Sequence, residues 1–170
     1  MAEPMTLPTH VHAAQAAMPA PLRARQRGRI GTVLLATDLS AVSAEAADEA
    51  MGLCSAVRAR LVVVNVIDQR QGFGRSLLPT ARAMRADQVR AERERRLLEV
   101  VGQARVSGID ASFLVWSGEP GQSIVAAAEA EDADLVVVGT RALDRAGRFL
   151  LGSVSDYVVN HSPCPVLIAR

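Results

Sequence analysis

Short apolar runs and longer mixed segments alternate along most of this chain. From Ile30 onward, five runs rich in β-branched residues each have the length of a strand. The segments between them are rich in Ala, Arg and Glu, which favour helices. In one of these segments, "RAERERRLLEV", Glu92 and Arg96 are spaced to pair along a helix, and we interpret that charge run as a solvated face. The predicted strands are 32–36, 60–67, 111–116, 134–138 and 165–169, and the predicted helices are 41–58, about 80–106, 122–131 and 152–160.

The predicted strands are apolar almost throughout, instead of alternating between apolar and polar residues. Such strands are buried on both faces, as in a parallel sheet that is covered by helices. Strands that alternate with helices build βαβ units with right-handed crossovers. The pattern therefore predicts an α/β fold, a three-layer α/β/α sandwich around an open five-stranded parallel sheet.

The first 29 residues do not share this pattern. Pro and Ala are frequent there, and no periodicity would bury one face of a helix or a strand. We predict a flexible Ala/Pro/Arg-rich tail over residues 1–29 and one domain over residues 30–170. The arginines near the end of the tail leave two alternatives to a solvated linker, which are an organelle presequence and a contact with a phosphate-rich partner.

Composition and charge argue against several classes of function. The formal net charge is +1, so no global field attracts nucleic acid or an acidic membrane. No apolar run reaches the roughly 18 residues that span a bilayer. The two cysteines lie in or beside apolar sequence and are too few for a disulfide framework. The sequence therefore predicts a soluble, cytoplasmic protein without nucleic-acid or membrane partners.

The residues that directly follow the strands are the first candidates for a binding site. In open parallel sheets, ligands bind beyond the carboxyl ends of the strands, where the strand order reverses. Thr37 and Asp38 follow the first predicted strand, and the Asp38 carboxylate can accept hydrogen bonds from a nucleotide base or ribose. The alternative is that Asp38 and Ser40 are ordinary N-caps of the next helix.

A loop with suggestive glycines follows the fourth predicted strand. It begins with Gly139, passes Arg141 and Ala142, and ends where Gly152 and Ser153 open a helix. Glycine lets the backbone approach a phosphate, and a helix N-terminus offers N–H groups and a positive dipole. The alternative is a simple cap with solvated arginines. The chain has no G-x-G-x-x-G after the first strand and no lysine for a P-loop, so those two nucleotide sites lose their support.

Together these motifs resemble the universal stress protein (UspA-like) family, from about residue 31 to residue 170. Nucleotide-binding members of that family carry G-x2-G-x9-G-[ST] after the fourth strand, and this chain has the same spacing with Ala142 at the second glycine. The segments "VLLATDLS", "VVVNVID" and "SGEPGQSIVAAAEAEDADLVVVGT" are also similar to the family. The resemblance implies an adenine-nucleotide alpha hydrolase-like fold.

The resemblance also implies a ligand, its contacts and an assembly. The ligand is ATP, together with Mg²⁺ that the triphosphate itself holds. Asp38 would contact the adenosine moiety beside Thr37, and Val66 would pack against adenine. Family members commonly pair their C-terminal strands across a two-fold axis, which implies a homodimer and removes a free sheet edge. The phosphates would lie among Gly139, Arg141, Ala142, Gly152, Ser153 and Val154.

Three functions are candidates for a chain with this pattern. The first is a small ATP-binding stress-response or signalling module that acts through its conformation and its partners. The second is a dimeric interaction protein of the same fold that does not bind nucleotide. Loss of all the loop glycines would indicate such a protein, whereas here only Ala142 departs from the glycine pattern. The third is a nucleotidyl transferase or an ATP pyrophosphatase, but "ATDLSAVS" matches neither signature. No catalytic residues are predicted, and slow ATP hydrolysis is the most we expect.

Overall fold

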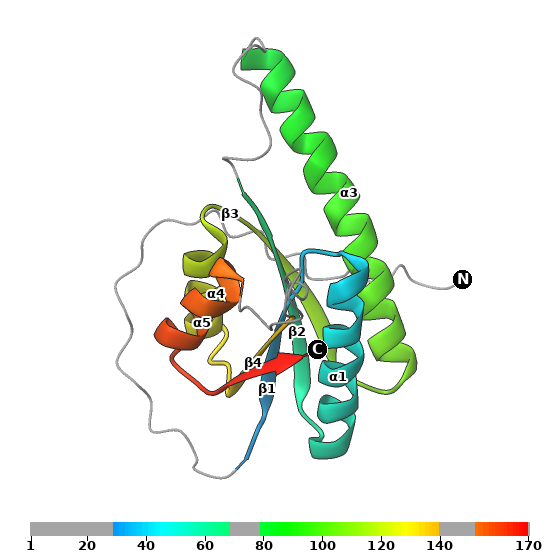
Figure 1. The fold of residues 1–170 in the computed structure, drawn as a ribbon. Helices are drawn as coiled ribbons and strands as arrows, with labels where there is room; N and C mark the ends of the chain where they lie inside the picture. The colour runs from blue at the N-terminus through cyan, green and yellow to red at the C-terminus, as the bar shows by residue number, and fades with distance from the viewer. Residues whose placement is uncertain (1–28, 69–78, 140–151, 170) are drawn as a thin grey trace, which may run out of the picture.

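A computed structural model describes residues 29–68, 79–139 and 152–169 of the chain. The predicted tail, except for Arg29, and most of the loop after the fourth strand lie outside these described residues. Strands and helices alternate in the predicted order (Figure 1). No described helix is both long enough and apolar enough to cross a membrane. The strands are β1 (Thr32–Ala36), β2 (Arg60–Ile67), β3 (Ala111–Ser117), β4 (Leu135–Gly139) and β5 (Val166–Ala169), and the helices are α1 (Ala41–Val57), α3 (Pro79–Val106), α4 (Pro120–Ala130) and α5 (Ser153–His161).

The strands form one parallel sheet in the order β3-β2-β1-β4-β5. Helices α1 and α3 lie on one face of the sheet, and α4 and α5 lie on the other (Figure 1). This arrangement confirms the predicted three-layer α/β/α sandwich. The chain builds outward from β1 to β3, then crosses back to add β4 on the other side of β1. The strand order therefore reverses between β1 and β4.

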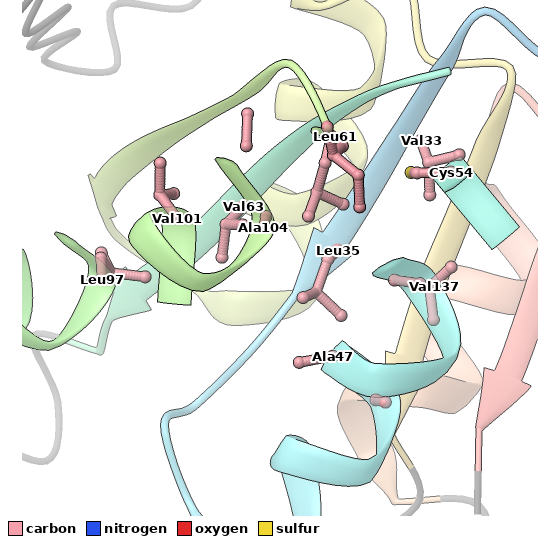
Figure 2. Packing of buried hydrophobic residues seen from close by; sticks show 14 of the residues in the cluster. Val33, Leu35, Ala47, Cys54, Leu61, Val63, Leu97, Val101, Ala104 and Val137 are labelled. Atoms are coloured by element: carbon pink, nitrogen blue, oxygen red, sulfur yellow. The ribbon is translucent and has the colours of Figure 1, made fainter. Parts of the chain in front are cut away.

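Each face of the sheet packs into its own apolar cluster, because successive strand residues point to opposite faces. Leu35 of β1 lies in the cluster under α1 and α3, together with Leu61, Val63 and Leu97 (Figure 2). Its neighbour Leu34 lies in the opposite cluster, under α4 and α5. Burial on both faces explains why the strand sequences show almost no polar alternation.

Several element ends differ from the predicted ones because of local capping. Helix α1 ends at Val57 because Arg58 adopts a left-handed conformation with φ of 56°. Helix α4 begins at Pro120, earlier than predicted, because Glu119 caps it by accepting a hydrogen bond from the N–H of Gln122 at 2.9 Å. Proline suits the first turn, where its missing N–H has no helical partner. Glu119 followed by Pro120 was therefore a signal for the start of a helix.

Helix α3 is the longest element and extends beyond the sheet. Its 28 residues span about 42 Å, and its N-terminal half projects past the strands (Figure 1). The predicted solvated face is present, but its pairing differs. Arg95 donates to Glu92 at 2.8 Å and to Glu99 at 2.6 Å, and the hydrogen bond from Arg95 lowers the pKa of Glu92. Arg96, the predicted partner of Glu92, is instead directed at the β1–α1 turn.

Candidate functional site

The carboxyl ends of β1 and β4 lie side by side where the strand order reverses. Ala36 and Val138 are register partners, so Asp38 and Gly139 leave the sheet at adjacent points. A cavity of about 760 Å³ opens at this edge. That volume suits a small-molecule ligand. The fold thus places a ligand-sized cavity where open α/β sheets bind ligands.

Most of the residues predicted to bind nucleotide border this cavity. They come from the β1–α1 turn, from the ends of β2 and β4, and from the start of α5. Arg141 and Ala142 lie outside the described residues. The predicted residues on the cavity wall are Thr37, Asp38, Val66, Gly139, Gly152, Ser153 and Val154.

One side of the cavity is apolar. Val64, Val66 and Ile67 line it from the end of β2, Ile124 lines it from α4, and Val138 lines it from β4. Val66 and Ile67 are only partly buried, so part of their apolar surface is accessible. An apolar wall of this kind can bury one face of a planar ring, since transfer of apolar surface from water is favourable.

The turn after β1 separates the roles of its two cap candidates. Ser40 is the N-cap of α1, because its hydroxyl accepts a hydrogen bond from the N–H of Ser43 at 3.3 Å. Asp38 does not cap the helix. Its Oδ1 accepts from the N–H of Ser40 at 3.0 Å, and the exposed residue borders the cavity. A carboxylate has several lone pairs, so this contact does not exhaust its capacity to accept hydrogen bonds.

Thr37 also borders the cavity, but its hydroxyl is used within the turn. It accepts from the N–H of Leu39 at 3.0 Å and lies 2.8 Å from the hydroxyl of Ser43. Ser43 donates its hydrogen to the carbonyl of Ser40 at 2.9 Å, so Thr37 must be the donor to Ser43. With its donor and one acceptor site engaged, the buried Thr37 hydroxyl shapes the turn.

The start of α5 forms another part of the cavity wall. Gly152 is the N-cap and provides no side-chain cap, so the first-turn N–H groups of this helix keep their capacity to donate. Ser153 and Val154 of this first turn border the cavity. Ser155 donates to the carbonyl of Gly139 at 3.0 Å and so ties the helix start to the end of β4. A helix N-terminus in this position favours an anion.

Sequence reasoning missed the wall that α3 contributes. Arg85, Val89 and Arg93 border the cavity at spacings of four residues. Farther along, Leu97 and Val101 continue the same stripe into the apolar core. The spacing of these residues was a signal, because residues four apart share a helix face. From the sequence, however, we interpret the charged part of this helix as a solvated face.

Two further carboxylates, Asp68 after β2 and Glu119 before α4, also border the cavity. Both follow predicted strands, as Asp38 does, so they belong to the segments that the sequence marks as first candidates. Nevertheless, residues 29–68, 79–139 and 152–169 contain no cluster of three His, Cys, Asp or Glu side chains that could hold a metal ion. The carboxylates surround a cavity rather than a common point.

Comparisons with known proteins agree with this architecture. The sequence profile of the universal stress protein family matches residues 29–170. A relative from Thermus aquaticus, the universal stress protein in QAH/OAS sulfhydrylase 3'region, is 38% identical over 143 residues, which cover 82% of this chain and 98% of the relative. The family profile extends over the whole described fold.

Solved structures show the same fold. The universal stress protein UspA from Lactobacillus plantarum matches with a TM-score of 0.72 at 23% identity and covers 84% of this chain and 99% of its own. A universal stress protein solved in complex with cAMP matches with a TM-score of 0.63 at 29% identity and covers 84% of this chain and 98% of its own. The likeness therefore extends over most of the chain and shows a shared fold.

Proposed function

The chain belongs to the universal stress protein family, and from that premise we propose that it is a small adenine-nucleotide-binding module of the stress response. The observation that carries this proposal is the cavity between β1 and β4, which combines a carboxylate, an apolar side and a helix N-terminus. These are the groups that a nucleoside and its phosphates require. The relative that was solved with cAMP supports an adenine nucleotide as the ligand class.

In the proposed complex, ATP spans the cavity. Asp38 accepts hydrogen bonds from the adenosine moiety, and Val66 packs against adenine. The phosphates lie at Gly139 and the α5 N-terminus, beside Arg141 in the loop. Where Mg²⁺ accompanies ATP, we propose that the triphosphate itself holds it. The module acts in the cytoplasm through its conformation and partners, with at most slow ATP hydrolysis.

The first test concerns Ala142, which lies outside the described residues and stands where the resemblance places a phosphate-binding glycine. If that position needs a left-handed backbone in the bound state alone, alanine costs on the order of 1 kcal/mol, or roughly tenfold in affinity. We therefore expect the wild type to bind ATP and the Ala142→Gly variant to bind it about tenfold more tightly. Isothermal titration calorimetry measures both affinities.

Thermal unfolding without ligand is the control, because the two proteins should be similarly stable. Equal affinities would show that the methyl group of Ala142 does not limit phosphate binding. No binding by either protein would reject the nucleotide proposal. It would favour the alternative, a dimeric interaction protein of the same fold that does not bind nucleotide.

The second test concerns a homodimer through β5, which we also propose. β5 is an edge strand of the sheet, and Leu167 on it is 38% exposed. An apolar edge strand invites pairing with another chain. We expect Leu167→Lys to shift a dimer toward monomers, because a two-fold axis would bring two lysines together.

Sedimentation velocity at micromolar concentration measures this shift. The matched control is Leu98→Lys, at a residue on α3 that is 43% exposed and far from β5 along the chain. The control should keep the wild-type sedimentation coefficient. A wild type that sediments as a monomer would contradict the proposed dimer.

A further inference from the structure

Three consecutive carbonyl groups in the β1–α1 turn accept hydrogen bonds from side chains of other elements. The carbonyl of Thr37 accepts from Nδ2 of Asn65, in β2, at 2.8 Å. The carbonyl of Asp38 accepts from Nη1 of Arg93, in α3, at 2.9 Å. The carbonyl of Leu39 accepts from Nη2 of Arg96, one helical turn farther along α3. The backbone around Asp38 is thus held from outside the turn.

The turn needs such support because Leu39 has a left-handed backbone with φ of 63°. For a non-glycine residue this conformation is disfavoured about tenfold, and it persists where the surroundings hold it. The side chain of Leu39 is buried in the core, its N–H donates to Thr37, and its carbonyl accepts from Arg96. Charged donors form the stronger class of hydrogen bond, so the guanidinium groups are substantial supports.

We propose that Arg93 and Arg96 are positioning residues of the nucleotide site, which hold the Asp38 carboxylate at the cavity by fixing the carbonyls of Asp38 and Leu39. This inference rests on the proposed function. Arg96 does not border the cavity, so it acts on a ligand only through the turn. Arg93 borders the cavity and bonds the turn, so it has a second possible action, a direct contact with phosphate.

The experiment compares the affinity for ATP with the affinity for adenosine, which has no phosphate. We expect Arg96→Gln and Arg93→Gln each to weaken both ligands about tenfold, the loss of one charged hydrogen bond to the turn. Arg93→Lys should restore most of the affinity, because one carbonyl needs only one donor. Arg95→Gln is the matched control on the solvent side of the same helix and should bind like the wild type. Circular dichroism checks that each variant is folded.

Two results would overturn the positioning role. If Arg93→Gln and Arg96→Gln weaken ATP but leave adenosine unchanged, the arginines act on the phosphates. The second result comes from a double-mutant cycle with Asp38→Asn. If the arginines act through Asp38, Arg96→Gln should change ATP affinity less than about twofold in the Asp38→Asn background, and a full tenfold loss there would contradict the inference.

A readout without ligand separates this inference from the proposed function. Amide hydrogen exchange at Leu39 and Ser40, measured by NMR, reports how firmly the turn is held. We expect about tenfold faster exchange in Arg93→Gln and Arg96→Gln, and no change in Arg95→Gln. If the wild type binds no nucleotide, the proposed function fails while this measurement still tests the support. Unchanged exchange in both variants would reject the role of the arginines, whatever the wild type binds.

Discussion

The free energy of unfolding should fall by about 2–5 kcal/mol when Leu35 is replaced with alanine. Leu35 lies in the central strand β1 with no exposed surface, under α1 and α3 (Figure 2). The shorter side chain loses apolar burial and leaves a cavity that the surrounding strands cannot close, since β1 is paired on both sides. Because a domain of this size is stable by only about 5–15 kcal/mol, this single change removes a large share of its stability.

Urea unfolding followed by circular dichroism measures the loss. Leu98→Ala is the matched control, because it removes the same atoms from a leucine that is 43% exposed on α3. The control should change the unfolding free energy by less than about 1 kcal/mol. A Leu35→Ala variant as stable as the control would show that the packing around β1 relaxes far more than a sheet paired on both sides should allow.

Affinity for ATP should fall about 10- to 100-fold when the carboxylate of Asp38 is removed. A hydrogen bond to a charged group contributes about 1.5–3 kcal/mol, which corresponds to this range. Asp38→Asn keeps an oxygen that can accept from the N–H of Ser40, so its loss of affinity should lie at the lower end of this range. Asp38→Ala also removes that contact within the turn, so its loss of affinity should lie at the upper end.

Calorimetric titration of both variants with ATP and with adenosine measures these affinities. Asp48→Asn is the matched control, because Asp48 is an exposed carboxylate on α1 that does not border the cavity. All three variants should unfold at similar temperatures. If both Asp38 variants bind adenosine as well as the wild type does, the assignment of Asp38 to the nucleoside is wrong.

The fold could be predicted closely from the sequence because its determinants are local. Five apolar runs separated by helical segments leave few arrangements, and a sheet buried on both faces must be covered by helices on both faces. The errors lie at element ends, as at Glu119 and Pro120, where a cap of one or two residues decides the boundary. Such caps are weak signals until the neighbouring backbone is known.

The location of the cavity was predictable for a related reason. Parallel strands bring all their carboxyl ends to one edge, so Asp38 and Gly139 had to lie near one another once the sheet was parallel. The resemblance to the universal stress protein family indicated which loop residues to consider. It did not reveal that the Thr37 hydroxyl is engaged within the turn, which depends on the meeting of Thr37, Leu39 and Ser43.

The sequence by itself thus determined the order of strands and helices, the buried faces and the edge of the sheet that carries the cavity. Only the tertiary structure decided what α3 does. In the sequence, Arg93 and Arg96 belong to a charged run with carboxylate partners nearby. In the fold, Arg96 reaches Leu39, 57 positions earlier in the chain. Spacing along a helix shows which residues share a face, but which element that face meets depends on how the whole chain packs.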